Sequence, residues 1–513
     1  MELDPAACYR ALRARDPRFD GRFVTAVRST GVFCRPICPA PPPKPENCLF
    51  LPCAAAAAAA GYRPCLRCRP ESAPGTPAWL GSSATVQRAL RLIDEGALDR
   101  GPVASLAARL GVGERQLRRL FLRHLGASPL AVAKARRVLF AKRLLDETEL
   151  PVTRVAFAAG FGSVRRFNDA LLRSYGRPPG ALRRLRRQPT TPARGGEIAL
   201  RLPFRPPYDW DGVLSYLAAR ATPGVEEVVG GVWRRTLRAG AAEGVVSVER
   251  VGAEPQLLAR FQLSEPAPLA ALAARLRRLF DLCADPHEIR AHLRRDPRLR
   301  ACVDARPGLR VPGAWEGFEL AVRVILGQQV SVGAATTLMG RLALRWGEPL
   351  RRAAPGGAAP PLRCHFPSPR SLARADLGSL GLPRQRADCL RGLAAAAASG
   401  RLELEAPRGL EELLAGLRRI PGLGDWTAQM IALRLGEPDA FPAGDLGLRR
   451  ALGAAPGGAG ERALRAAAER WRPWRGYAAM ALWLGPPDPG PRPVRRRPRL
   501  RSARAAAPAS GAP

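Results

Sequence analysis

Four cysteines near the start of the chain form two close pairs, Cys34 with Cys38 and Cys65 with Cys68. Two thiolate pairs on separate loops suit tetrahedral Zn²⁺, which four sulfur ligands can satisfy without a histidine. A zinc ion also keeps a cysteine sulfur deprotonated near neutral pH, and the thiolate is the nucleophilic form. The spacing therefore predicts one zinc ion held by these four cysteines, and four unrelated thiols are the alternative.

A second chemically distinctive segment lies late in the chain. Residues 417–433, LRRIPGLGDWTAQMIAL, predict two helices joined by a tight hairpin at 421–424. Backbone N–H groups at the start of the second helix are free to bind a phosphate. Asp445 follows in the segment DAFPAGDLGLRRAL. An isolated aspartate before a helix is most often an N-cap, so the surrounding sequence must decide its role.

The charge of the chain favours nucleic acid as a partner. Its 513 residues include 82 arginines and lysines against 44 acidic residues, a formal net charge of +38. Such an excess attracts polyanions over long distances, although a GC-rich genome would also enrich arginine. No apolar run is long enough to span a membrane, and residues 1–10 lack the features of a signal peptide. We therefore expect a cytoplasmic, bacterial, nucleoid-associated protein with no membrane partner.

Proline- and glycine-rich runs divide the chain into several predicted domains, so the fold class is multidomain and mainly α. Alternating apolar residues at 197–204 and 244–251 predict strands, and residues 54–60 and 267–282 predict helices. The expected parts are a small α+β zinc domain at 1–77, an all-α domain with two helix-turn-helix units at 84–186, an α+β domain at 197–310, an all-α helix-hairpin-helix domain at 311–485 and a disordered basic tail at 486–513.

The sequences around the cysteines, GVFCRPIC, PENCLFLPCAAAA and GYRPCLRC, resemble the methyl-acceptor zinc domain of Ada-type alkylation-response proteins over most of residues 5–72. The resemblance implies that Cys34 is both zinc ligand and nucleophile and takes one methyl group irreversibly from a methylphosphotriester in DNA. Methylation would change the formal charge of the site from −2 to −1 and so favour DNA binding. Arg67 is expected to contact phosphate, and Cys48 and Cys53 are expected to be small buried residues. Pro41 replaces an arginine usual in the family, which leaves a purely structural zinc site open.

Two helix-turn-helix units are predicted at 103–125 and 151–175, joined by a helix at 129–145. The segment VTRVAFAAGFGSVRRFNDALLRSYGRPPGALRR resembles the AraC-type DNA-binding domain, in which the second helix of each unit reads the major groove. A helix bundle with merely solvated arginines is the alternative. The candidate base-contacting residues are Glu114, Arg115, Arg118, Ser163, Arg165 and Arg166. The expected core residues are Leu106, Leu110, Leu117, Phe121, Phe157 and Phe167.

Together with VILGQQVS at 324–331 and WRPWRGYAAMALW at 471–483, the hairpin and Asp445 resemble AlkA-type 3-methyladenine DNA glycosylases over residues 197–485. The resemblance implies hydrolysis of the N-glycosidic bond of alkylated purines such as 3-methyladenine and 7-methylguanine. Asp445 would be the catalytic carboxylate, which stabilises oxocarbenium character or positions water. The target nucleotide must be flipped out of the duplex to reach it.

The same resemblance assigns the substrate and DNA contacts. Trp483 would stack on the cationic base, which an electron-rich ring favours over a neutral one. The other expected substrate residues are Trp426, Met430, Gln328 and Gln329, with Gln329 where a relative inserts an apolar wedge. Trp474 and Tyr477 are expected to be supporting or core aromatics. The expected hairpin contacts to DNA are Gly422, Gly424 and Thr427.

Several absences narrow the expected chemistry. Trp426 stands where strand-cleaving relatives carry a nucleophilic lysine, and no lysine follows Lys142, so monofunctional hydrolysis is predicted. A late cysteine cluster for iron–sulfur is missing, as is a PCHR segment for O6-methylguanine repair. The expected partners are alkylated duplex DNA, promoter DNA and RNA polymerase. The alternatives are a transcription activator with an inactive glycosylase half, and a glycosylase whose front half only delivers it to DNA.

Overall fold

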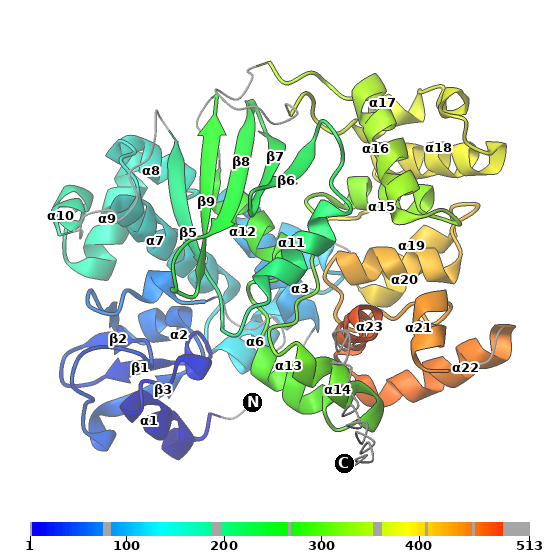
Figure 1. Cartoon of the computed structure of the whole chain (residues 1–513). Coiled ribbons are helices and arrows are strands. Elements are labelled where there is room, and N and C mark those ends of the chain that lie inside the picture. The colour runs from blue at the N-terminus through cyan, green and yellow to red at the C-terminus, as the bar shows by residue number, and fades with distance from the viewer. Residues whose placement is uncertain are drawn as a thin grey trace, which may run out of the picture.

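The computed structural model describes residues 3–74, 84–185, 197–264, 268–351, 362–405, 409–453 and 457–485. The predicted basic tail at 486–513 lies outside these ranges. Helices dominate, and a five-stranded sheet stands at the upper centre of Figure 1, with the blue N-terminal elements below it on the left and the orange C-terminal helices below it on the right. Among the described helices, none combines the length and apolar character needed to cross a bilayer.

The N-terminal segment is a small α+β unit. Helix α1 (Pro5–Arg13) begins at Asp4, whose carboxylate accepts hydrogen bonds from two backbone N–H groups. Strands β1 (Val24–Val27), β2 (Val32–Cys34), β3 (Cys48–Leu51) and β4 (Arg63–Pro64) form a sheet in the order β3-β1-β2-β4. The alanine run forms helix α2 (Ala54–Ala59), as predicted. Strands β2 and β4 therefore bring the two cysteine pairs to the same end of the sheet.

The next segment is entirely helical and contains both predicted helix-turn-helix units. Its elements are α3 (Ala84–Asp94), α4 (Ala97–Arg100), α5 (Val103–Arg109), α6 (Glu114–Leu125), α7 (Pro129–Glu147), α8 (Val152–Ala158), α9 (Val164–Tyr175) and α10 (Pro179–Arg184). Each tight turn depends on a glycine with positive φ, Gly111 at +68° and Gly160 at +90°.

The expected core of these units is confirmed at five of six positions. Leu106, Leu110, Leu117, Phe121 and Phe167 are buried. The prediction for Phe157 is wrong, because its side chain is 53% exposed. Valine and alanine residues form the buried face of the short helix α8, so the intervening Phe157 turns to solvent.

The third segment builds an antiparallel sheet with the order β5-β9-β8-β7-β6. Its strands are β5 (Ile198–Pro203), β6 (Glu226–Val229), β7 (Val232–Ala239), β8 (Ala242–Arg250) and β9 (Gln256–Leu263). Helices α11 (Trp210–Ala218) and α12 (Leu269–Leu279) accompany it. Trp233 on β7 and Phe261 on β9 are fully buried, as inward-facing residues of an alternating strand are, and Phe280 at the end of α12 packs against Trp233.

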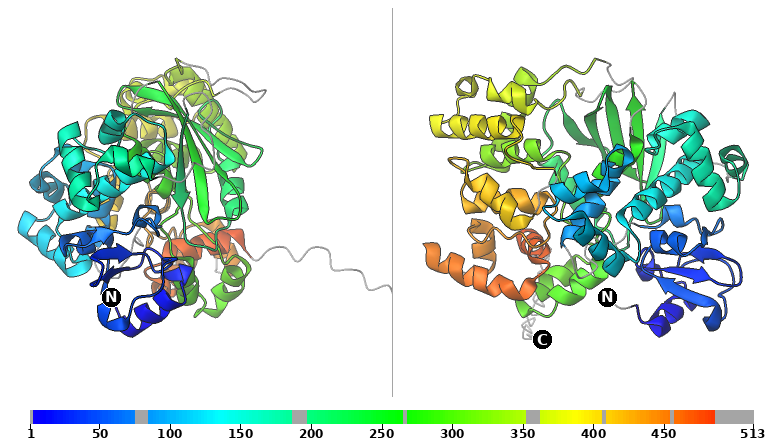
Figure 2. Two further views of the ribbon diagram at one scale, coloured as in Figure 1. Left: turned by 90° about the vertical axis from the view of Figure 1, so that its left-hand side faces the viewer. Right: turned by 180° about the vertical axis from the view of Figure 1, so that it is seen from behind.

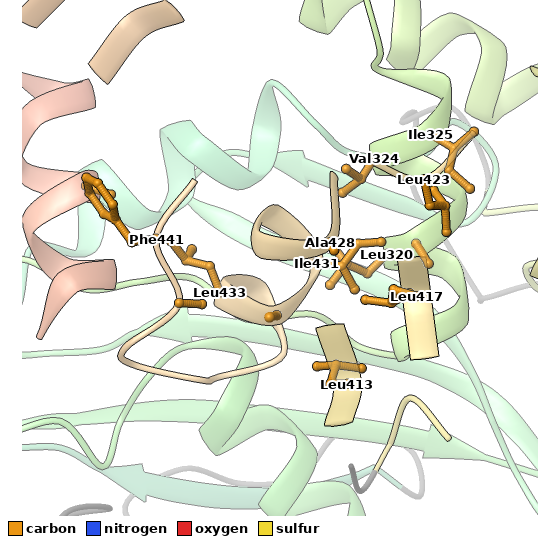
Figure 3. Packing of buried hydrophobic residues seen from close by; sticks show 14 of the residues in the cluster. Leu320, Val324, Ile325, Leu413, Leu417, Leu423, Ala428, Ile431, Leu433 and Phe441 are labelled. Atoms are coloured by element: carbon orange, nitrogen blue, oxygen red, sulfur yellow. The ribbon is translucent and has the colours of Figure 1, made fainter. Parts of the chain in front are cut away.

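The C-terminal helices share one large apolar core. They are α13 (Pro286–Leu293), α14 (Pro297–Ala305), α15 (Gly317–Leu326), α16 (Val332–Trp346), α17 (Pro369–Ala373), α18 (Arg384–Ala398), α19 (Leu410–Arg418), α20 (Asp425–Arg434), α21 (Leu446–Ala451), α22 (Gly457–Ala468) and α23 (Arg475–Leu484). Figure 3 shows Leu320 and Val324 of α15 near Leu417 of α19 and Ala428 of α20. Burying each leucine contributes about 1.5–3 kcal/mol, so this core holds the hairpin helices in place.

The cores of neighbouring segments are continuous across the predicted domain borders. The second helix-turn-helix unit shares one hydrophobic cluster with the five-stranded sheet, in which Leu144 and Leu200 are both fully buried. Glu147 on α7 accepts a hydrogen bond of 2.9 Å from the backbone N–H of Arg201 on β5. Viewed from behind in Figure 2, the helices of residues 84–125 lie between the N-terminal segment and the C-terminal helices. The helix-turn-helix segment is thus packed directly onto the rest of the protein.

Candidate active site and metal centre

The carboxylate of Asp445 is held by three N–H donors from three elements. Asp445 is the N-cap of α21, and its Oδ1 accepts hydrogen bonds from the backbone N–H of Leu448 at 3.0 Å and from Trp483 Nε1 at 2.9 Å. Its Oδ2 accepts one from Trp426 Nε1 at 3.1 Å. The side chain remains partly exposed. Asp445 is therefore a helix cap and also an oriented anion beside two indole rings.

A residue that sequence reasoning missed makes room for this arrangement. A Cβ atom on Gly447 would lie 3.0 Å from Asp445 Oδ1 and 3.3 Å from Trp483 Cδ1. A larger side chain there would push against both partners of the carboxylate–indole hydrogen bond. The glycine two positions after Asp445 was the available signal, since glycine inside a helix otherwise costs stability.

The hairpin between α19 and α20 adopts the predicted tight turn. Gly422 has φ +91°, a conformation that glycine reaches without strain. Gln328, at the end of α15, donates from Nε2 to the carbonyl of Gly422 at 3.3 Å and to Thr427 Oγ1 at 3.0 Å. The side chain of Thr427 is only 3% exposed, so any contact of this residue with DNA would be made by its backbone. Gln328 and Thr427 thus position the hairpin, while Gly422 and Gly424 are exposed at its tip.

The remaining predicted substrate residues divide between surface and core. Gln329 is exposed, with φ +58°, on the loop before α16, and Met430 is half-buried against the core of the C-terminal helices. Trp474 and Tyr477 are buried, so of the two expected roles, supporting or core aromatics, they have the core role. Tyr477 donates its hydroxyl to Asp281 Oδ2 at 2.7 Å.

Charged side chains flank the start of α20. Asp425 pairs with Arg418 and, at 3.0 Å, with Arg465. Burial raises the pKa of Asp425, but hydrogen bonds from the two arginines outweigh it and hold that pKa below its usual value. The negative side chain also suits the positive end of the helix. Arg418 and Arg465 therefore place positive charge beside the hairpin, and neither was among the predicted site residues.

The four predicted cysteine ligands converge into one cluster. The Sγ atoms of Cys34, Cys38, Cys65 and Cys68 are buried and all lie within 4.8 Å of one another. Tetrahedral zinc with Zn–S bonds near 2.3 Å places its sulfurs about 3.8 Å apart, which is within the 4.8 Å that encloses these four atoms. Cys48 and Cys53 are half-buried and outside this cluster. The donor set therefore fits zinc.

Arg35 organises the backbone around the cluster. Its N–H donates to Cys68 Sγ at 3.3 Å, and its guanidinium binds Asp20 and the carbonyl of Cys68. A hydrogen bond with the Cys34 thiol lowers the pKa of Cys38. Arg67, between the last two ligands, is exposed as a phosphate contact requires. Pro41 is likewise exposed.

The second helices of both helix-turn-helix units present arginines to solvent. Arg115, Arg118, Arg165 and Arg166 are exposed on α6 and α9. Glu114 pairs with Arg118 at 2.8 Å, whereas Ser163 Oγ caps α9 by accepting from the N–H of Arg166 at 3.2 Å. The hydroxyl of Ser163 is therefore already engaged.

Four protein families match the chain: the metal binding domain of Ada at residues 7–71, a helix-turn-helix domain at 106–185, the AlkA N-terminal domain at 199–316, and the HhH-GPD superfamily base excision DNA repair protein at 322–475. A Mycobacterium tuberculosis protein named probable bifunctional transcriptional activator/DNA repair enzyme AlkA is 46% identical over 486 residues, 94% of this chain and 97% of that protein. The chain belongs to this family of bifunctional AlkA proteins.

Shorter relatives match the two halves of this bifunctional AlkA protein separately. DNA-3-methyladenine glycosylase 2 of Escherichia coli is 39% identical over 286 residues, 55% of this chain and 95% of that protein. The bifunctional transcriptional activator/DNA repair enzyme Ada of Escherichia coli is 38% identical over 155 residues, 30% of this chain and 42% of that protein. The protein is thus a DNA glycosylase joined to a zinc-binding domain and a DNA-binding helix-turn-helix activator. An inactive glycosylase half is not favoured.

Proposed function

We propose that this protein hydrolyses the N-glycosidic bond of alkylated purines, such as 3-methyladenine and 7-methylguanine, in duplex DNA. The observation that carries the proposal is the partly exposed Asp445 carboxylate, held by N–H groups of Leu448, Trp426 and Trp483. A fixed anion costs no reorganisation when positive charge develops on the sugar. The name of the Escherichia coli glycosylase supports the same substrate class.

The reaction requires little acid catalysis. An alkylated purine is already cationic and leaves as a neutral base when the bond between its nitrogen and C1′ breaks. Asp445 would stabilise the oxocarbenium character of the sugar, and water would supply the hydroxyl group at C1′ and release a proton to solvent. Because Lys142 is the last lysine of the chain, no lysine amine is available in the C-terminal half to attack C1′. We therefore expect monofunctional hydrolysis without strand cleavage.

Recognition of the base would rest on Trp483. Its indole N–H is directed to Asp445, so its ring lies against the carboxylate while remaining only partly buried. A flipped cationic base stacked on this ring gains cation–π attraction that a normal base lacks. Gln329, exposed at a loop beside the hairpin, would fill the space left in the duplex. Met430 on α20 is half-buried and would contact the flipped base from that helix.

Base release from methylated DNA by wild type and Asp445→Asn tests this function. Asparagine still accepts the Leu448 N–H, but its NH₂ group would face an indole N–H, so the N-cap survives and the anion is lost. We expect release of 3-methyladenine to become undetectable while DNA affinity changes less than threefold. Asp388→Asn, at an exposed carboxylate on α18, is the matched control. Retained release by Asp445→Asn would exclude this mechanism.

The zinc domain is proposed to accept one methyl group from a methylphosphotriester. Bound zinc would keep the sulfur of Cys34 as a thiolate. That sulfur would attack the methyl carbon, the carbon–oxygen bond would break, and the phosphate would leave as an anionic diester with the electron pair. Arg67 is exposed beside the cluster and would hold the phosphate. We propose a stoichiometry of one zinc ion per chain and no iron–sulfur cluster.

Transfer of labelled methyl from methylphosphotriester DNA tests the sensor. Wild type should take up about one methyl group per chain at Cys34, and Cys34→Ala should take up none. A label on another cysteine would reassign the nucleophile. Absence of transfer by wild type with a full zinc content would favour the second candidate, in which the front half only delivers the glycosylase. The proline at Pro41, in place of the arginine usual in the Ada family, is the observation favouring that candidate.

We propose that α6 and α9 read promoter DNA through Arg115, Arg118, Arg165 and Arg166, with RNA polymerase as the partner of the bound activator. Exposed arginines on the second helix of each unit support base contacts. The functional division would follow residues 1–77, 84–186, 197–310 and 311–485, with 486–513 as a tail. Arg165→Ala should weaken promoter binding at least tenfold without slowing base release from non-promoter DNA. Unchanged promoter affinity would exclude this reading helix.

A further inference from the structure

A cavity of about 440 Å³ lies where all four parts of the chain meet. The residues around it come from the zinc-binding segment, the helix-turn-helix segment, α12 and the C-terminal helices. Its volume falls within the range of small-molecule sites. Asp445, Trp483, Gln329 and the zinc ligands are not among its described lining residues, so it is distinct from both sites above.

One arginine of this interdomain cavity carries a buried donor with no acceptor. Arg143 of α7 lines the cavity, is 2% exposed, and binds Glu147 through Nε at 3.3 Å. Its Nη2 is buried, and within the described part of the chain it has no hydrogen-bond partner. A buried unsatisfied polar group costs about 1–3 kcal/mol, and more when charged. The geometry therefore calls for an acceptor at this position.

A second guanidinium lies close to the first. Arg277 of α12 lines the cavity, is half-buried, and makes no side-chain hydrogen bond or ion pair with any residue that the structure describes. Burial lowers the pKa of Arg143, and the positive charges of Arg277 and Arg69 lower it further. Arg91, on the same cavity, donates only to the backbone carbonyls of Leu435 and Gly436. Like charges are thus gathered where an anion would relieve their repulsion.

Asp94 lines the cavity and faces positive charge, since it pairs with Arg136 at 3.8 Å and attracts Arg277, whereas other acidic lining residues are engaged elsewhere. Glu437 pairs with Arg88 at 3.3 Å, and Asp281 Oδ2 accepts from Tyr477 and from a backbone N–H. Arginines outnumber acidic residues among the described lining residues. Apolar groups complete the wall, including Phe140 and Ala274. The cavity therefore combines an excess of arginine over acidic residues, including the unpartnered Nη2 of Arg143, with apolar surface.

We propose that this interdomain cavity binds a small organic anion, in which a phosphate, sulfonate or carboxylate group is held by Arg143 Nη2 and Arg277 and an apolar portion packs against Phe140 and Ala274. Because the walls come from both the sensor and the glycosylase halves, the bound anion stabilises their packing against each other. Arg277 and Arg143 belong to different segments, so neither half alone contains the site.

Fluorescence titration of the full-length, zinc-loaded protein with 8-anilinonaphthalene-1-sulfonate tests the site. Salt of about 0.3 M screens attraction to exposed arginines far more than attraction inside the cavity. We expect saturable binding of one probe per chain. Arg277→Gln should weaken it at least tenfold, and Arg374→Gln, an equal loss of charge at an exposed position, should leave it unchanged. Equal affinity of wild type and Arg277→Gln would overturn the proposal.

A second variant separates occupation of the cavity from attraction by net charge. Ala274→Leu keeps every charge but fills part of the cavity, so it should also weaken probe binding at least tenfold. Circular dichroism and thermal unfolding of each variant establish that it is folded. Inorganic pyrophosphate should displace the probe if the charged group dominates, and should fail to do so if the apolar portion is required. Displacement by undamaged duplex DNA, or full affinity in Ala274→Leu, would assign the probe to an exposed surface and overturn the proposal.

Discussion

Replacing Trp483 by phenylalanine isolates the contribution of the indole N–H to the proposed catalysis. Phenylalanine keeps an aromatic face for the base but removes the 2.9 Å hydrogen bond to Asp445 Oδ1. Trp426→Phe is the matched variant, because it removes the 3.1 Å hydrogen bond to the other oxygen, Oδ2. In both variants the backbone N–H of Leu448 still holds the carboxylate.

A hydrogen bond to a charged group contributes about 1.5–3 kcal/mol, which corresponds to about 10- to 150-fold in rate. Because two of the three donors to Asp445 remain in each variant, we expect the lower end, about tenfold, for the chemical step. The loss should fall on kcat, since the orientation of the carboxylate acts on the transition state rather than on binding of the damaged DNA.

Single-turnover base release from methylated DNA at saturating enzyme measures the chemical step directly. Equal losses in Trp483→Phe and Trp426→Phe would identify the donated hydrogen bonds as the cause. A loss of rate confined to Trp483→Phe would instead mean that phenylalanine stacks on the cationic base less well than the indole ring does. Rates within twofold of wild type in both variants, together with an inactive Asp445→Asn, would refute the reasoning that the indoles orient the carboxylate.

Two further predictions concern stability. Burial raises the pKa of Asp281 to about 6, so between about pH 4 and 6 the folded protein holds a proton that the unfolded chain has lost, and stability falls as pH rises through this window. The variant Asp281→Asn keeps an acceptor for the Tyr477 hydroxyl but removes the buried charge. It should raise the free energy of unfolding by about 2–3 kcal/mol at pH 7.5 and change it little at pH 4. Equal effects at both pH values would contradict this. In thermal unfolding, Gly422→Ala should destabilise the protein by about 1–2 kcal/mol more than Gly453→Ala. Both glycines have positive φ, but only a Cβ at position 422 would meet Cys389, at 3.1 Å. Equal losses of stability would exclude this contact as the cause.

Apolar periodicity and turn-forming glycines in the sequence made much of the secondary structure predictable. The alanine run became α2, and both helix-turn-helix units formed around glycines that accept positive φ, because helix period and turn chemistry act over a few residues. Phe157 shows where this reasoning fails. Its apolar character predicted burial, but which face of a short helix meets the core depends on the surface it packs against, and α8 uses smaller residues there.

The candidate active site was only partly accessible to the same reasoning. Asp445 and the hairpin could be identified from their surrounding sequence, as could the cysteine ligands from their spacing. The partners that orient Asp445 could not, since Trp426 and Trp483 lie 19 and 38 residues away in the chain. Nor could the inward orientation of Thr427, which depends on a hydrogen bond from Gln328 across 99 residues. Such contacts follow from the packing of helices and have no local signal.

The chemistry available to this chain was set by the order of its residues: four thiols at ligand spacing, a glycine hairpin followed by an aspartate, and a large excess of arginine. Tertiary packing decided how those groups act together. It joined α7 to β5 in one core, and it placed Arg205 of the sheet segment against the carbonyl of Asp20 at 3.1 Å, 185 residues away. It also gathered arginines from different segments around a shared cavity. The physical reason is that helix and turn preferences are local, whereas burial, charge neutralisation and hydrogen-bond orientation depend on segments that meet only when the chain has folded.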